Sequence, residues 1–214
     1  MRLRKIKNGA MVISLIACLM LASTGCAKKA KDFSFDTMEK IFQKHGAVKF
    51  GSFSEYEEDQ EKDVPEDVLD KGYCNYIYCE GQEAQSIFEN NITLSESSYK
   101  ISRTLELEYG KTCTETSMDF VGISLYSFSS EKEAEDFFKE NFDSDEDSQI
   151  RYDITRSGKK NGYRYTVRRT DGKGGAVFQY NDKMLHIVFH LGEAKNDLIS
   201  DISKEFGIMN PLTA

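Results

Sequence analysis

The fold is decided by residues 149–191, which read QIRYDITRSGKKNGYRYTVRRTDGKGGAVFQYNDKMLHIVFHL. Turn signals at Asn161-Gly162, at residues 171–175 and at Asn181-Asp182 divide this stretch, because Gly, Asn and Asp tolerate the positive φ angles of tight hairpins. Apolar and polar residues alternate in the four runs between the turns, as in strands with one buried face. The stretch therefore predicts a four-stranded antiparallel meander. The residues expected on its apolar face are Ile150, Tyr152, Ile154, Tyr163, Tyr165, Val167, Phe178, Tyr180, Leu185, Ile187, Phe189 and Leu191.

Helices are predicted on both sides of this stretch in the sequence, because apolar residues recur there at helical spacing. These segments are residues 35–45, 82–91, 131–142 and 194–206. The third begins with the capping box SEKE at residues 130–133, in which a Ser oxygen and a Glu carboxylate each accept from a free backbone N–H. We expect the helices to cover one face of the antiparallel sheet, which gives an α+β architecture.

The first half of the chain predicts strands at residues 73–79 and 100–109. Between the first helix and these strands, residues 52–70 are acidic and poor in apolar side chains, and we expect a mobile surface loop there.

The two halves share part of their pattern. At an offset of 50 residues, the sequence around Phe88 repeats around Phe138. A duplicated strand–helix–strand–strand unit, with halves at about 34–117 and 118–214, explains this match. Two copies of an ordinary amphipathic pattern explain it nearly as well. Residues 34–214 are expected to form a single domain.

The start of the chain has the three parts of a secretory signal peptide. Four basic residues and no acidic residue precede position 26, and an uncharged apolar run extends from Ala10 to Ala22. That run is too short for a membrane span, which needs about 20 residues. Small residues follow at Ser23-Thr24-Gly25, directly before Cys26. We therefore predict a signal peptide over residues 1–25.

The segment Ser23-Thr24-Gly25-Cys26 resembles the lipobox of bacterial lipoproteins, although Ser23 stands where that family usually has Leu. The resemblance implies cleavage before Cys26 and attachment of a diacylglycerol to its thiol. It also implies a location on the extracytoplasmic face of the cell membrane, with residues 26–33 as the lipidated tether. The alternative is a plain secretory signal, with Cys26 an ordinary thiol. In its layout the chain resembles the small uncharacterised lipoproteins of Gram-positive bacteria.

The charge of the chain argues against nucleic acid as a partner. Without residues 1–25, the sequence has 24 basic and 36 acidic residues, a net charge of −12. Phosphate groups would be repelled by such a surface. Of the remaining cysteines, Cys74 and Cys79 lie about 16 Å apart in an extended strand, too far for a disulfide. Either could pair with Cys113, and three reduced thiols are the simpler interpretation.

One candidate ligand site lies on the polar face of the meander, where Arg151, Arg164, Arg168, His186 and His190 are expected together. Arginine and histidine side chains can bind a carboxylate or a phosphate. The alternative is a solvated sheet face without a binding role. His186 and His190 lie about 13 Å apart along a strand, so they cannot share a zinc ion.

A candidate calcium site follows the helix at 131–142. Asp143, Asp145 and Asp147 resemble the alternating ligands that open a calcium-binding loop. Ser148 stands where such a loop has Gly, and Ile154 where it has a bidentate carboxylate. The alternative is a solvated acidic linker.

These observations predict a membrane-anchored extracytoplasmic lipoprotein whose domain is a non-enzymatic binding or interaction module. The expected partners are membrane lipid, through acylated Cys26, and an envelope protein or small ligand. One alternative is a cell-envelope hydrolase or other enzyme that uses scattered acidic residues or histidines. A third function is a calcium-stabilised adhesion module.

Overall fold

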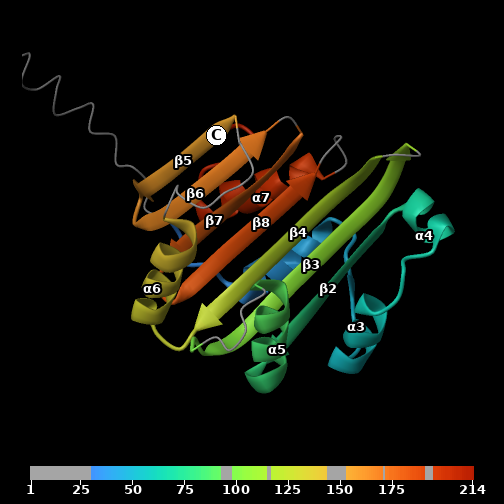
Figure 1. The fold of residues 1–214 in the computed structure, drawn as a ribbon, viewed down its shortest axis with the longest axis horizontal. Helices are drawn as coiled ribbons and strands as arrows, with labels where there is room; N and C mark the ends of the chain where they lie inside the picture. Colours follow the sequence, from blue (N-terminus) through green and yellow to red (C-terminus); the bar gives the residue numbers. More distant parts are fainter. Residues whose placement is uncertain (1–29, 93–97, 115–116, 144–152, 171, 191–194) are drawn as a thin grey trace, which may run out of the picture.

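The computed structural model describes residues 30–92, 98–114, 117–143, 153–170, 172–190 and 195–214, and at its centre lies an eight-stranded sheet (Figure 1). The strand order is β1-β2-β3-β4-β8-β7-β6-β5. Only the pair β1–β2 is parallel, so the predicted α+β class with a mainly antiparallel sheet is confirmed. The strands are β1 (Val48–Lys49), β2 (Tyr73–Glu80), β3 (Ile101–Thr114), β4 (Ser117–Phe128), β5 (Ile154–Lys160), β6 (Tyr163–Thr170), β7 (Lys173–Tyr180) and β8 (Lys183–His190).

Tight turns join the strands of the second half. β5, β6, β7 and β8 pair antiparallel in sequence order. Asn161 and Gly162 join β5 to β6 with φ angles of 52° and 94°, and Asn181 after β7 has a φ of 54°. Asn and Gly adopt these left-handed angles at low cost, which is why the sequence turns at these positions.

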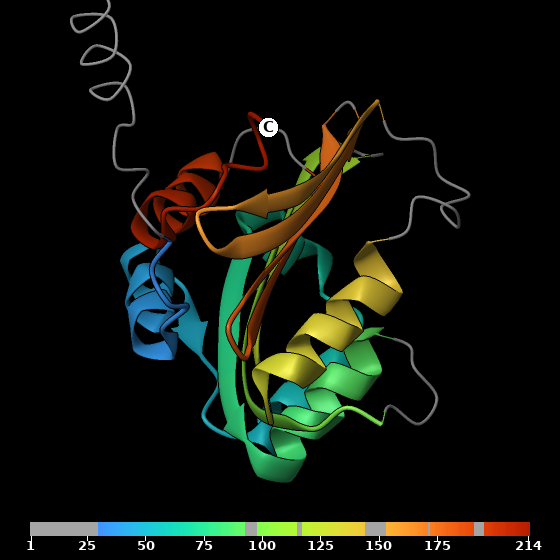
Figure 2. The same cartoon turned by 90° about the vertical axis from the view of Figure 1, so that its left-hand side faces the viewer.

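Helices α2 (Phe35–Lys44) and α7 (Asn196–Phe206) lie side by side on one face of the sheet, called here the α2–α7 face (Figure 2). Both are strongly amphipathic, and their apolar sides join a core with inward residues of β3, β4 and β8. Ser34 begins α2 by accepting from the backbone N–H of Thr37 at 3.3 Å. Gly207, with a φ of 66°, ends α7.

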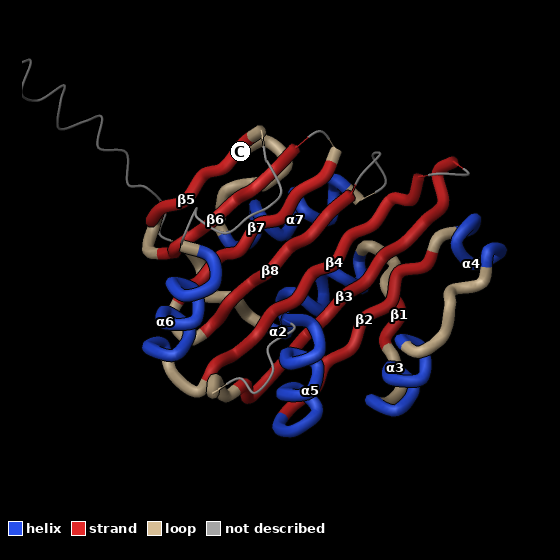
Figure 3. The backbone as a smooth tube through the Cα atoms, in the orientation of Figure 1, coloured by secondary structure: helices blue, strands red, loops and turns tan. Residues whose placement is uncertain are grey.

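Helices α5 (Gly81–Ile92) and α6 (Glu131–Phe142) lie on the other face, called here the α5–α6 face (Figure 3). The expectation that helices cover only one face is therefore wrong. The physical reason is that the central strands are apolar on both sides: in β4, Ile123 belongs to the α2–α7 core and Tyr126 to the α5–α6 core. The capping box is half formed, since Ser130 accepts from the N–H of Glu133 at 3.2 Å, while the Glu133 carboxylate accepts from the N–H of Lys100.

The acidic segment predicted as a loop contains two short helices, α3 (Phe53–Gln60) and α4 (Glu66–Lys71). Ser52 caps α3 by accepting from the N–H of Glu55 at 3.2 Å. Tyr56 is the one buried residue of α3, and among the described residues of α4 none is buried. α3 is therefore held by a local cap at Ser52 and by the buried ring of Tyr56, two features that composition alone does not reveal.

The chain joins the folded body at Ala30. The N–H of Ala30 donates to the carbonyl of Asn161 at 2.9 Å, and the N–H of Lys31 donates to the carbonyl of Phe206 at 3.1 Å. Phe33 is fully buried, with its ring 5.4 Å from that of Phe206 and 6.0 Å from that of Tyr180. Residues 30–33, the end of the segment predicted as a tether, are thus packed against the sheet and α7.

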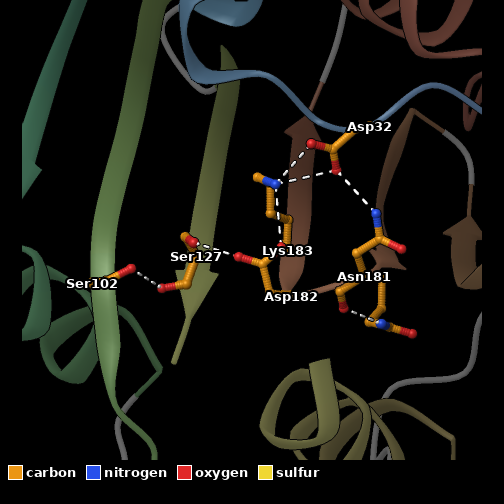
Figure 4. Close-up of polar contacts among 7 residues, drawn as sticks. Asp32, Ser102, Ser127, Asn181, Asp182 and Lys183 are labelled. Atoms are coloured by element: carbon orange, nitrogen blue, oxygen red, sulfur yellow. Dashed lines mark hydrogen bonds and ion pairs between the residues drawn. The ribbon is translucent and has the colours of Figure 1, made fainter. Parts of the chain in front are cut away.

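An ion-pair network fixes the same segment to the β7–β8 turn (Figure 4). The Nζ of Lys183, whose side chain is 11% exposed, lies 2.9 Å from a carboxylate oxygen of Asp32 and 3.2 Å from one of Asp182. Ser127 donates to Asp182 at 2.9 Å, and Asn181 donates to Asp32 at 3.4 Å. Burial alone would raise the pKa of Asp182, but the hydrogen bond from Ser127 and the charge of Lys183 hold it below its usual value.

Candidate functional site

The residues of the predicted anion site share the α5–α6 face but do not converge. Arg164 and Arg168 belong to β6, and His186 and His190 to β8, with β7 between these strands. Each pair is four residues apart along its strand, about 13 Å. Arg151 lies outside the described residues. In the strand register neither arginine lies directly across from a histidine, so the described members are dispersed over the face rather than gathered in one pocket.

Arg164 is committed to a contact with α6. Its guanidinium lies 3.2 Å from a carboxylate oxygen of Glu135, and its side chain is 17% exposed. The hydrogen bond from Arg164 holds the pKa of Glu135 below its usual value. The buried Nε of Arg164 has no hydrogen-bond partner among the described residues. The ion pair of Arg164 therefore connects β6 to α6.

His186 carries no positive charge at neutral pH. Its ring lies 6.0 Å from the ring of Phe142 at the end of α6. Burial lowers the pKa of His186 to about 4, because the charged imidazolium loses its hydration there. His186 therefore contributes no positive charge to an anion site at neutral pH.

The candidate calcium site is only partly described. Asp143 forms the C-terminal cap of α6, whereas Asp145 and Asp147 lie outside the described residues. In the part of the chain that the structure describes, no three His, Cys, Asp or Glu side chains gather in a metal-binding arrangement. The calcium site stays a prediction.

A polar site that the sequence did not indicate surrounds Glu106 in the middle of β3. Its carboxylate accepts from the Tyr56 hydroxyl of α3 at 3.3 Å and from the side-chain amide of Asn91 in α5 at 2.5 Å. Burial raises the pKa of Glu106 to about 7, although both hydrogen bonds act in the opposite direction. Glu106 therefore changes protonation near neutral pH, which is unusual for a glutamate and typical of functional sites.

A second glutamate lies two residues along the same strand. The carboxylate of Glu108 accepts from the hydroxyl of Tyr73 and, at 3.4 Å, from the side-chain amide of Gln60. Gly110 leaves room for the tyrosine ring, since a Cβ at this position would lie 2.5 Å from a Tyr73 ring carbon. Both glutamates thus receive a tyrosine hydroxyl from a neighbouring element.

Around these side chains lies a small pocket between α3, β2 and β3, called here the Glu106 pocket. It has about the space of one water molecule. Its lining combines aromatic rings with carboxylates, a combination that attracts positive charge. The members that matter for recognition are Phe50, Tyr56, Asp59, Tyr73, Glu106 and Glu108.

The network continues across the sheet. The Asn91 amide also lies 3.2 Å from the hydroxyl of Tyr126, which is hydrogen-bonded to Ser124 as well. In the strand register, Ser124 lies directly between Glu106 and His186. The two groups with shifted pKa values are therefore about 10 Å apart, two strand spacings. They are not a directly bonded acid–base pair.

Sequence reasoning missed this site because its parts come from distant segments. Glu106 alternates with the apolar Leu105 and Leu107, so its position indicated a solvent-facing strand residue. Its partners Tyr56 and Asn91 precede it by 50 and 15 residues. The one local signal was Tyr56, an aromatic residue within the acidic run at 52–70. Its role is recognisable only when α3 is known to pack on the sheet.

The cysteines are separate in the structure. Cys74, Cys79 and Cys113 are all free, and they are half-buried, buried and exposed respectively. Burial raises the pKa of the Cys79 thiol to about 12, so it stays protonated and unreactive at neutral pH. The pairing of Cys113 with either other cysteine is not formed in this structure.

Comparisons with family models, with curated proteins and with solved structures found no match for this chain. No helix within the described ranges has both the length and the apolar character needed to cross a bilayer.

Proposed function

We propose that the chain is a bacterial lipoprotein held on the extracytoplasmic face of the cell membrane by a diacylglycerol on Cys26. The observation that carries this is the signal pattern of residues 1–25 ending at Ser23-Thr24-Gly25-Cys26. The position of Ala30 supports it, because the folded body begins four residues after the cysteine. Two acyl chains on one residue are sufficient for stable anchoring.

Replacement of the cysteine tests the anchor. Cys26→Ala should move the protein from the membrane fraction to the soluble extracytoplasmic fraction. The matched control is Cys113→Ala, because Cys113 is exposed and free in the folded body. This control should leave the protein with the membrane. Unchanged membrane association of Cys26→Ala would refute the proposal.

We further propose that the body is a binding module whose Glu106 pocket accepts a positively charged group, such as a lysine ammonium, of an envelope protein or small ligand. A buried carboxylate that receives only neutral donors is costly when ionised. The rise of the Glu106 pKa from 4.5 to about 7 reflects this cost. A cation in the pocket would remove it, because an opposite charge within hydrogen-bonding distance favours the ionised carboxylate.

Methylammonium is a suitable probe, because it reproduces the end of a lysine side chain. The carboxyl carbon of Glu106 can be followed by NMR during a pH titration in methylammonium chloride and in sodium chloride of equal ionic strength. The proposal predicts a lower Glu106 pKa in methylammonium than in sodium chloride. The carboxyl resonance of Glu58, which is 72% exposed on α3, is the control for general salt effects. Identical titration of Glu106 in both salts would refute it.

An enzymatic function is the second candidate, and the same glutamate favours it. A carboxyl group with a pKa of about 7 can act as a general acid or base at neutral pH. A hydrolase acting through Glu106 would lose turnover of envelope material in Glu106→Gln, and its pH–rate profile would show an inflection near 7. Full activity of that variant would exclude Glu106 as the acid–base group.

Calcium stabilisation through Asp143, Asp145 and Asp147 is the third proposal, and it rests on their spacing. Excess calcium should then raise the melting temperature of the protein, because a ligand that binds only the folded state stabilises it. The rise should disappear in Asp145→Asn. A melting temperature that calcium does not change would refute this proposal.

We also propose that the two halves derive from a duplicated unit. The supporting observation is that α5 and α6 differ by an offset of 50 at both ends and lie on the same sheet face. Transplanting residues 131–142 into positions 81–92 should then preserve folding. Residues 195–206, from the opposite face, are a control of equal length that should not fit. Equal disruption by both transplants would argue against duplication.

A further inference from the structure

The strands at the β5 edge of the sheet concentrate positive charge on an otherwise acidic protein. Residues 154–173 contain seven basic residues and one acidic residue, a net charge of +6. The chain from Cys26 onward has a net charge of −12, so the rest of it carries −18. Net positive charge is therefore concentrated at this end of the sheet.

The chain enters the folded body at this same end. Ala30 is hydrogen-bonded to Asn161 in the turn that follows Lys159 and Lys160. The end of α7 is also close, since a Cβ on Gly207 would lie 3.8 Å from the Cα of Ala30. Lys204 lies in the last turn of α7 and is exposed. We call Lys159, Lys160 and Lys204 the anchor-side patch.

We propose that the anchor-side patch is a docking surface for an anionic lipid leaflet, the leaflet in which the Cys26 lipid would be inserted. The inference rests on the proposed lipoprotein function and adds an orientation to it. The β5–β6 turn then faces the headgroups, and α3 and α4 point away from them.

The short spacer between Cys26 and the folded body supports an anionic lipid leaflet as the binding partner of the patch. Only residues 27–29 separate Cys26 from Ala30, and these four steps span at most about 14 Å. Electrostatic attraction to a surface extends over a Debye length of about 8 Å in physiological salt. A body held this close brings its nearest lysines within reach of the headgroup charge. Lys28 and Lys29 in the spacer add to the same field.

Two acidic groups beside the patch are already paired. Glu205 lies 2.7 Å from the Nζ of Lys31, and Asp32 lies 2.9 Å from the Nζ of Lys183. These contacts reduce the repulsion that the carboxylates would otherwise exert on an anionic surface. Lys159 and Lys160 are both exposed at the end of an edge strand.

Charge reversal at matched positions tests the docking surface. The protein used in this test comprises residues 26–214 with Cys26→Ala. It contains every described residue and needs no lipid modification. Its binding to phosphatidylcholine vesicles containing one third phosphatidylglycerol is measured by cosedimentation at low and physiological salt. Lys159→Glu/Lys160→Glu is compared with Lys62→Glu/Lys71→Glu. The control pair changes the net charge equally at two exposed lysines, one just after α3 and one in the last turn of α4.

We expect the hairpin variant to bind these vesicles about tenfold more weakly or worse, and the control variant to bind like the parent. Pure phosphatidylcholine vesicles should bind neither. Equal losses in the two variants would reduce the effect to net charge and overturn the proposal. Unchanged binding of the hairpin variant would also overturn the proposal. Tighter binding of the parent protein to soluble polyphosphate than to vesicles of equal phosphate content would overturn it as well. Because the test protein carries no lipid, these outcomes are independent of whether Cys26 is acylated in cells.

Discussion

The two ends of the sheet differ in charge and in packing. The anchor end, at β5 and β6, has a net charge of +6 over residues 154–173 and holds the fully buried Phe33. The acidic end, at residues 53–71 beside β2 and β3, has nine acidic and two basic residues, a net charge of −7. Its two helices contribute one buried side chain, Tyr56.

This difference indicates a division of roles. Segments with few buried apolar contacts open at low free energy, and binding sites are commonly built from them. The acidic end has this character and contains the Glu106 pocket. The anchor end is held by aromatic packing and by the Lys183 network. Under the proposed lipid modification of Cys26, this packing would transmit the position of the lipid to the domain.

The largest expected effect separates the two ends by packing. Phe33→Ala removes a fully buried ring and should lower the free energy of unfolding by about 3–5 kcal/mol. Phe53→Ala in α3 removes a half-buried ring and should cost about 1–2 kcal/mol. Urea denaturation of both variants measures these values. Equal losses would remove the distinction between a firmly packed and a lightly packed end.

The acidic end should respond to pH through Glu106. Its folded pKa of about 7 lies above the unfolded value of 4.5, so its contribution to stability is fully present below pH 4.5 and is lost as pH rises through 7. The loss amounts to about 3 kcal/mol. Glu106→Gln should abolish this pH-dependent loss, because glutamine does not ionise, so the variant should be more stable than the parent at pH 8. Urea denaturation at pH 5 and pH 8 measures this, with Glu58→Gln as the exposed control.

The centre of the sheet should respond in the opposite direction through His186. Its folded pKa of about 4 lies below the unfolded value of 6.5. Its contribution is therefore present above pH 6.5 and is lost as pH falls through 4, again by about 3 kcal/mol. In the parent protein the two groups offset each other between pH 4.5 and 6.5. In His186→Gln, stability should rise as pH falls across this range, and a curve parallel to that of the parent would contradict the assignment.

A smaller effect is expected at the junction of the N-terminal segment and the β7–β8 turn. Lys183→Met leaves Asp32 and Asp182 without their shared cation, but both carboxylates are partly exposed. The loss should be about 1–2 kcal/mol. Lys62→Met removes the exposed ion pair with Glu58 and should cost about 0.5 kcal/mol or less. Thermal unfolding of both variants compares the two ends directly.

Local rules were sufficient for much of the fold. Positive φ at Asn161 and Asn181 follows from turn chemistry, and α2 ends at Lys44, close to the predicted position, because Gly46 adopts a left-handed φ of 80°. These local rules did not predict that helices cover both faces of the sheet. The polar residues on one face of β3 predicted that this face is exposed to solvent. Instead, Thr104 on this face is fully buried beneath α5, and its hydroxyl donates to the carbonyl of Ala84.

The site was less predictable than the fold, because it depends on contacts between distant segments. Glu106 has a shifted pKa only because α3 and α5 both pack against β3. His186 was expected to contribute positive charge, and its place beneath Phe142 removes that charge. Strand alternation reports which residues share a face, but not which helix then covers them.

The central claim is that Cys26 is the lipid-modified first residue of the mature protein. Mass spectrometry of the detergent-extracted protein after trypsin digestion tests it directly through the peptide Cys26–Lys28. The account predicts a peptide that begins at Cys26 and carries the added mass of a diacylglycerol on sulfur. A mature chain that begins elsewhere, or an unmodified Cys26 in membrane-associated protein, would contradict it.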